Sequence, residues 1–389
     1  MHILDDIDVQ KCELAFEKAL KIVDRNLRDH DCGMFPLDAA SNGVYKWRKE
    51  NKGWVSGFWT GILWLSWEKS RKERYRAALQ KYLLSFEERA QTRHGLNHHD
   101  MGFLYSLSCV PAYINWNDET AKAAAIQAAD VLVERFSEKG EFIVAWGEIG
   151  DDWTVENGNF LIVDCFLNIP LLYWAADVTG NRKYSDVAER HLNTTIKHII
   201  RSDGSTFHKY EFQYSTGAPI GGMTWQGAAD DSCWSRGQAW AVYGLALNYS
   251  ATKNEKIISE FKKVTSFFVN HLPKDYIPYW DFNYSDGDGE PKDSSAAAIA
   301  VCGIMQMAEQ LPEDNDIAEF KIIAEKMLNS LIDNYSADYS ETNEGILLHG
   351  TDAKPQNYGI DEPTIYGDYF YMEALLRCIK PHKNYWLGK

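Results

Sequence analysis

The sequence predicts an all-α protein in which six helical hairpins close into a single (α/α)6 toroid. Along the chain, segments with one apolar face alternate six times with segments that are apolar almost throughout. A surface helix keeps a polar stripe, whereas a helix that is apolar all round is buried, so the alternation indicates an outer and an inner ring. The possible strands, at residue 55 and at residues 141–144 and 279–280, are too short to build a sheet.

The amphipathic segments are expected to form the outer ring. In the first of them, Val9, Leu14, Ile22 and Val23 lie on one face, and lysines and glutamates lie opposite. We expect the outer helices at residues 7–27, 71–90, 118–136, 183–200, 254–272 and 315–335.

The apolar segments are expected to form the inner ring. The stretch GWVSGFWTGILWLSWEKS, residues 53–70, is apolar throughout and aromatic at its start. DSSAAAIAVCGIMQMAEQ, residues 293–310, has the same apolar character. We expect the inner helices at residues 53–70, 98–114, 159–180, 234–251, 293–310 and 364–379.

Repeated helical hairpins form either an open solenoid or a closed ring. A solenoid needs polar end caps, but the last inner segment, residues 364–379, is as apolar as the middle ones, so we expect closure. No linker rich in Gly, Ser or Pro divides the chain. We therefore expect one catalytic domain that comprises residues 1–389.

Composition narrows the class of ligand. The formal net charge is -16, which argues against a nucleic-acid partner, because such a partner requires a basic surface. The 14 Trp, 21 Tyr and 17 Phe residues suit sugar rings, whose C–H faces stack on aromatic planes, although most of these residues must fill the core.

Further features bear on compartment and assembly. The seven cysteines are scattered without a CxxC pair, which is typical of reduced core thiols. The N-terminal stretch MHILDDIDVQ lacks the basic and apolar regions of a secretory signal, and no apolar run is long enough to span a membrane. We expect a soluble cytoplasmic protein without a membrane partner, either a monomer or a homodimer.

Parallel inner helices bring their N-termini together at one mouth of the toroid. Helix N-termini carry unpaired N–H groups and positive partial charge, which favour an anionic ligand. We therefore expect an aromatic, hydrogen-bonding mouth that accepts a carboxylate. The residues expected there are Trp54, Trp59, His98, His99, Asp100, Asn159, Asp164, Trp234, Arg236, Asp293, Ser294, Tyr366 and Asp368.

Asp164 is the one ionisable residue in the first dozen positions of the apolar segment 159–180. Burial disfavours the charged form of a carboxyl group and raises its pKa. A carboxyl group that stays protonated near neutral pH can act as a general acid. The alternative is a structural aspartate that forms hydrogen bonds with nearby backbone.

Other motifs for catalysis are absent from the sequence. His94, His98, His99 and Asp100 lack HExxH or three-ligand spacing, so we expect no metal site. The acidic stretch 286–290 lacks EF-hand spacing and reads as a solvated turn. No GxSxG, GxGxxG or GxxxxGK[ST] motif occurs, so we expect no cofactor. Paired carboxylates among aromatic residues indicate sugar chemistry.

Several stretches then give a specific resemblance. GWVSGFWTGILWL, HHDMGFLYSLS, NFLIVDCFLNIPLLYWA, TWQGAADDSCWSRGQAWAVYG, DSSAAAIA and TIYGDYFYMEALL are similar to the unsaturated glucuronyl hydrolases of glycoside hydrolase family 88. The resemblance runs in register along essentially the whole chain. It implies an (α/α)6 barrel without metal or nucleotide. It also implies hydration of the enol ether in a 4,5-unsaturated uronic acid at the non-reducing end of lyase-generated oligosaccharides.

The resemblance also assigns roles to residues. It implies that Asp164 is the acid/base and that Asp100 is a second essential aspartate that holds sugar hydroxyls. We expect His99, directly before Asp100, to contact the substrate too. The further substrate-contacting residues implied are Trp54, Trp146, His208, Gln226, Arg236 and Trp240, of which the tryptophans stack on the sugar.

The chain departs from the family pattern at three places. Trp225 stands where a histidine can occur, Tyr366 replaces a tryptophan, and residues 150–157 form an enlarged loop. The loop DAKPQNYGIDEP has Lys354 but no serine, whereas some relatives bind sulfate with serines and a lysine there. We therefore expect a preference for unsulfated substrates.

Three alternatives stay open. The first is an unsaturated rhamnogalacturonyl hydrolase, which has the same barrel and chemistry; the segment containing Asp100 favours the glucuronyl family. The second is a sugar 2-epimerase, which needs paired catalytic histidines, and His99 and His349 fit that role poorly. The third is a sugar-binding barrel without catalysis, which leaves the buried Asp164 unexplained.

Overall fold

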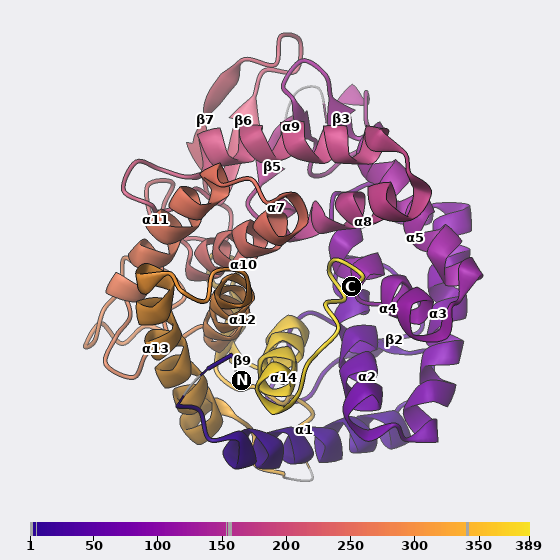
Figure 1. Cartoon of the computed structure of the whole chain (residues 1–389), viewed down its shortest axis with the longest axis vertical. Coiled ribbons are helices and arrows are strands. Elements are labelled where there is room, and N and C mark those ends of the chain that lie inside the picture. Colours follow the sequence, from indigo (N-terminus) through magenta and orange to yellow (C-terminus); the bar gives the residue numbers. More distant parts are fainter. Residues whose placement is uncertain (1–2, 5, 153, 155–157, 340–341) are drawn as a thin grey trace.

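In the computed structural model, helical hairpins close into a ring around an inner set of helices (Figure 1). The structure describes residues 3–4, 6–152, 154, 158–339 and 342–389. The last inner helix packs against both the first outer and the first inner helix, which closes the ring. The predicted (α/α)6 toroid is therefore confirmed.

The outer helices are amphipathic, as predicted. Helix α1 buries Phe16, Leu20 and Val23, and the side chain of its N-cap residue, Asp8, accepts hydrogen bonds from the amides of two first-turn residues. Leu14 was expected on the buried face but is 63% exposed. The outer helices are α1 (Val9–Asp29), α3 (Glu73–Thr92), α5 (Glu119–Glu134), α9 (Arg182–Ile199), α11 (Lys256–Asn270) and α13 (Asn315–Ser330).

The inner helices are buried along most of their length and approach one another closely. A Cβ on Gly244 of α10 would lie 2.2 Å from Cβ of Phe166, and one on Gly303 of α12 would lie 2.6 Å from Cα of Tyr243, so neither site has room for a side chain. The inner helices are α2 (Ser56–Ser70), α4 (Cys109–Trp116), α7 (Cys165–Asn168), α8 (Pro170–Thr179), α10 (Ser235–Thr252), α12 (Ser294–Gln310) and α14 (Ile365–Ile379).

The prediction of one helix over residues 159–180 is wrong. Its first residues form strand β5 (Phe160–Ile162), which pairs antiparallel with β6 (Lys209–Phe212), and β6 pairs with β7 (Pro219–Met223). The chain then turns at Asp164 into α7, and α8 begins at Pro170, which has no N–H to continue a helical hydrogen-bond series. Asp164 therefore lies at a strand-to-helix turn and not inside a helix.

The inner segment 98–114 is also interrupted. His98 forms an isolated bridge with Trp146, a π-helical turn η1 (Gly102–Ser106) follows, and α4 begins only at Cys109. Such π turns occur often beside functional sites. Both candidate catalytic aspartates, Asp100 and Asp164, thus precede the regular part of an inner helix.

Short antiparallel pairs of strands occur in the loops between the helices of the ring. The pairs are β1 (Phe35–Pro36) with β2 (Trp47–Arg48), β3 (Phe136–Ser137) with β4 (Phe142–Ile143), and β8 (Gly350–Ala353) with β9 (Tyr358–Glu362); η2 (Leu331–Tyr335) and η3 (Lys354–Gln356) are single turns. Strand β8 contributes to the mouth, because its Thr351 and Asp352 contact the start of α10. The expected loop 150–157 includes residues 153 and 155–157, which lie outside the described residues.

Two chemical features of the chain follow from this packing. None of the seven cysteines forms a disulfide bond, and all but Cys32 are buried. None of the helices that the structure describes is long and apolar enough to cross a membrane.

Candidate active site

A cavity of about 200 Å³ opens at the mouth where the inner helices begin. It brings together residues from eight separate parts of the chain, including both aspartates singled out from the sequence. Its lining residues are Trp54, His99, Asp100, Trp146, Ile162, Asp164, His208, Trp225, Gln226, Trp234, Arg236, Asp352 and Ala353.

Asp164 has the properties of a general acid. Burial raises the pKa of its carboxyl group to about 7, and the negative charge of Asp100 acts in the same direction, while Arg236 opposes both. Its Oδ2 is buried and has no hydrogen-bond partner among the described residues. The backbone around Asp164 is held independently, since its carbonyl accepts hydrogen bonds from Leu167 N and from Asn168 Nδ2.

Asp100 is the ionised partner of this pair. Its Oδ2 lies 3.0 Å from His98 Nδ1, and its Oδ1 lies 3.3 Å from His99 Nε2. Burial opposes ionisation, but the neighbouring imidazoles of His99 and His98 outweigh it, so the pKa of Asp100 lies below its usual value. Two carboxyl groups whose surroundings push their pKa values apart mark an acid and a stabilising anion.

His208 is held as a neutral hydrogen-bond donor. Burial, followed by the charge of Arg236, lowers its pKa to about 3. Its Nδ1 accepts hydrogen bonds from the backbone N–H groups of Trp225 (3.0 Å) and Gln226 (3.1 Å). The proton of the neutral ring is therefore on Nε2, and this N–H remains available to a ligand. His99, whose pKa burial lowers to about 4, is likewise neutral near pH 7.

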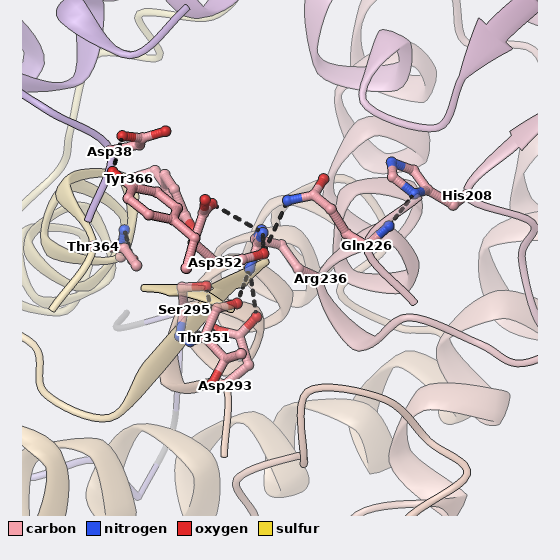
Figure 2. Close-up of polar contacts among 12 residues, drawn as sticks. Asp38, His208, Gln226, Arg236, Asp293, Ser295, Thr351, Asp352, Thr364 and Tyr366 are labelled. Carbon is pink, nitrogen blue, oxygen red and sulfur yellow. Dashed lines mark hydrogen bonds and ion pairs between the residues drawn. The ribbon is translucent and has the colours of Figure 1, made fainter. Parts of the chain in front are cut away.

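Arg236 is 1% exposed and organises the strand side of the cavity (Figure 2). Its Nη1 donates to Asp293 Oδ2 at 2.8 Å and to the carbonyl of Thr351 at 2.5 Å. Its Nη2 donates to the carbonyl of Asp352 at 2.6 Å and to Asp352 Oδ1 at 3.3 Å. Both Nη atoms are thus engaged by protein, and the guanidinium positions Asp352 and β8 more than it offers a free cation.

The predicted stacking tryptophans divide into two groups. Trp54 and Trp146 line the cavity, and Trp54 stacks on Tyr366 with ring centroids 5.4 Å apart. Trp240 is fully buried and does not line it; its ring packs between Phe103 at 5.1 Å and Phe370 at 5.5 Å. Trp240 therefore supports the aromatic core behind the site.

Asp352 is a carboxylate at the cavity that the sequence analysis did not single out. It is 6% exposed, it lines the cavity, and its Oδ1 accepts a hydrogen bond from Tyr366 Oη at 2.7 Å. Burial raises its pKa to about 6, and Arg236 opposes the rise. The only indication of Asp352 in the sequence was that it is the first residue of the stretch DAKPQNYGIDEP, which was considered for sulfate recognition.

No metal ligand set is identified in the part of the chain that the structure describes: it contains no group of three or more His, Cys, Asp or Glu side chains arranged around one point. The ionisable side chains that line the cavity are those of His99, Asp100, Asp164, His208, Arg236 and Asp352.

Residues 29–380 match the family described as Glycosyl Hydrolase Family 88. The chain belongs to this family. It is a glycoside hydrolase, as the sequence predicted.

The chain is similar to known proteins along almost its full length. The chain is 44% identical over 373 residues to the unsaturated chondroitin disaccharide hydrolase of Streptococcus pneumoniae (strain ATCC BAA-255 / R6), covering 96% of this chain and 93% of the relative. It is 39% identical to the unsaturated glucuronyl hydrolase of Bacillus sp. (strain GL1), covering 96% and 98%. A solved unsaturated glucuronyl hydrolase from Streptococcus agalactiae superimposes with a TM-score of 0.94 at 42% identity, covering 98% and 95%.

Proposed function

We propose that this glycoside hydrolase releases a 4,5-unsaturated uronic acid from the non-reducing end of lyase-generated oligosaccharides by hydrating the enol-ether double bond. The observation that carries the proposal is the buried Asp164 at the cavity, whose pKa burial raises to about 7, beside Asp100, whose pKa lies below its usual value. The names of its relatives, which refer to unsaturated chondroitin disaccharide and to unsaturated glucuronyl substrates, support the same substrate class.

The proposed first step is protonation of carbon. Asp164 gives its proton to C4 of the unsaturated sugar, and positive charge develops at C5 and the ring oxygen. Protonating an alkene carbon requires an undissociated acid held close to it in a site that excludes water, which matches the buried Oδ2 of Asp164.

The proposed second step adds water. The Asp164 carboxylate accepts a proton from a water molecule while the water oxygen bonds to C5, so the residue is returned to its protonated form. The product is a hemiketal at C5. Its C5–O bond to the ring oxygen breaks, C5 becomes a ketone, and the hemiacetal left at C1 expels the second sugar as an alcohol. One water molecule is consumed, and the glycosidic oxygen leaves with the second sugar.

The remaining cavity residues bind and orient the sugar in this proposal. The Asp100 carboxylate accepts hydrogen bonds from sugar hydroxyls, and the His208 Nε2–H donates one. Trp54 and Trp146 offer aromatic faces to the ring. Holding the double bond against Asp164 in this way supplies the orientation that the reaction needs.

The proposal is tested with an unsaturated chondroitin disaccharide and a saturated disaccharide of the same linkage. We expect loss of the near-ultraviolet absorbance of the first as its double bond is hydrated, and no cleavage of the second. Efficient cleavage of the saturated disaccharide would show ordinary displacement at C1 and would refute the hydration mechanism.

We also propose that the enzyme is cytoplasmic and that residues 1–389 act as one domain. The seven cysteines form no disulfide bond, which is typical of a reducing compartment. Because α14 packs against α1 and α2, removal of a hairpin would expose the inner face of its neighbours. Activity found only in a secreted fraction, or two separate thermal transitions, would contradict these two proposals.

A further inference from the structure

Asp352 presents an unused acceptor to the cavity. Its Oδ1 is held by Tyr366 Oη at 2.7 Å and by Arg236 Nη2 at 3.3 Å, so the carboxylate is fixed in orientation (Figure 2). No hydrogen bond joins its Oδ2 to another described residue, and this oxygen is not among the atoms sealed from solvent. Because Asp352 lines the cavity, Oδ2 is available to a bound sugar.

Asp352 lies on the side where the cavity opens. Trp225, another lining residue, is 54% exposed and therefore marks the entrance. Two hydrogen bonds tie its loop to the β8–β9 hairpin: Gln226 Nε2 donates to the carbonyl of Asp352 at 2.9 Å, and Gln356 Nε2 donates to the carbonyl of Trp225 at 2.8 Å. An enzyme that removes a terminal sugar encloses that sugar, so the second sugar lies toward this entrance.

Among the lining residues that the structure describes, none is an uncompensated cation. Arg236 is the one Lys or Arg among the described lining residues, and it is bonded to the carboxylates of Asp293 and Asp352. Lys354, which follows β8, pairs with Glu290. His208 and His99 are neutral near pH 7, because burial lowers both of their pKa values.

We propose that Asp352 is a specificity-determining residue that selects an uncharged second sugar. Its Oδ2 accepts a hydrogen bond from a hydroxyl of that sugar, while a sulfate in the same place offers only acceptor oxygens and a second negative charge. Tyr366, which replaces the family's tryptophan, contributes the hydroxyl that orients Asp352. This inference rests on the proposed function and adds the residue that sets preference for the leaving sugar.

The test compares unsulfated and 6-sulfated unsaturated chondroitin disaccharides near pH 7. We expect the wild-type kcat/KM to be higher for the unsulfated substrate. Asp352→Asn keeps an oxygen for Tyr366 and Arg236 but removes the charge, so it should reduce this preference at least about tenfold, mainly by improved KM on the sulfated substrate. Tyr366→Phe keeps the charge of Asp352 but removes the hydrogen bond that orients its carboxylate. This variant should reduce the preference about threefold.

A matched charge control is available on the same hairpin. Asp361 lies in β9 and forms an ion pair with His349. Its side chain is 57% exposed, and it does not line the cavity. Asp361→Asn should leave the preference unchanged. An unchanged preference in Asp352→Asn, or an equal change in Asp361→Asn, would overturn the role of Asp352.

A binding measurement separates this inference from the proposed function. In an Asp164→Asn background, the two disaccharides are titrated and tryptophan fluorescence is followed, since three tryptophans besides Trp54 line the cavity. Tighter binding of the unsulfated sugar that is lost on adding Asp352→Asn supports the inference even if the wild type turns over neither substrate. Equal affinities in both backgrounds overturn it even if both substrates are turned over.

Discussion

Replacing Asp164 with Asn should abolish turnover and at the same time stabilise the protein at alkaline pH. The substitution keeps the shape of the side chain and removes only the transferable proton. Because one residue acts as both acid and base in the proposed mechanism, the loss in kcat should be at least about 10³-fold, within the range for general acid–base groups. Substrate binding should be nearly unchanged, because the Asn side chain has the same shape as Asp and fills the same space beside the sugar.

The stability change follows from the pKa. The folded state raises the pKa of Asp164 from 3.8 to about 7, mainly through burial. The folded protein therefore retains a proton that the unfolded chain releases, so its stability falls as pH rises from about 4 to about 7. At 1.36 kcal/mol for each pKa unit, the cost reaches about 4 kcal/mol above pH 7. An uncharged Asn avoids this cost, apart from the desolvation of its amide.

Thermal unfolding of both proteins at about pH 8 and about pH 4.5 measures the effect. We expect the Asn variant to unfold several degrees higher than the wild type at the alkaline pH. The difference should shrink to about a quarter at the acidic pH, where the folded wild type is protonated and only the unfolded chain is largely ionised. Asp361→Asn, which removes an exposed carboxylate outside the cavity, is the control for loss of a negative charge. Equal melting temperatures at the alkaline pH would refute the buried, protonated state of Asp164, and a tenth of wild-type activity would refute its role as acid.

Three further outcomes are expected. The kcat/KM of the wild type should fall as pH rises through about 7, because Asp164 must be protonated; a rate that rises through this range would contradict the assignment. Asp100→Asn should severely impair turnover and lower the pH of that fall, since the Asp100 charge helps to keep the proton on Asp164; an unshifted profile would deny the coupling. Dialysis against EDTA should leave activity intact, and a loss that a divalent cation restores would reveal a metal requirement.

The hairpin arrangement was predictable from the sequence because it depends on local periodicity. The fully apolar stretch that became α12 and the one-sided stretch that became α1 each record in their own residues whether the helix is inner or outer. Ring closure was predictable as well, because the apolar character of α14 required partners on both sides.

The interruptions of the inner helical segments were not predictable in the same way. Phe160, Leu161 and Ile162 are compatible with a buried helix and with a buried strand, and their partners in β6 lie about fifty positions further along the chain. Pro170 was the available sign that the segment could not be one helix. Periodicity within the segment gives no information on pairing with a distant strand.

The site divides similarly between residues whose chemistry is local and residues defined by distant contacts. Asp164 was identified because an isolated carboxyl group in an apolar stretch is visible in the sequence. The role proposed for Asp352 in β8 depends on its contacts with Arg236 in α10 and Tyr366 in α14, and no spacing in the sequence indicates these contacts. The burial of Trp240 behind the cavity likewise depends on Phe103 and Phe370.

The position of solvent hydrogen in the product tests the central proposal most directly. When an unsaturated disaccharide is turned over in heavy water, transfer of the solvent-exchanged proton of Asp164 should place deuterium at C4 of the released sugar. Nuclear magnetic resonance of the product reports this position. Deuterium at C4, with the glycosidic oxygen retained by the second sugar, is the predicted result. A product without deuterium at C4 would contradict hydration of the double bond by Asp164.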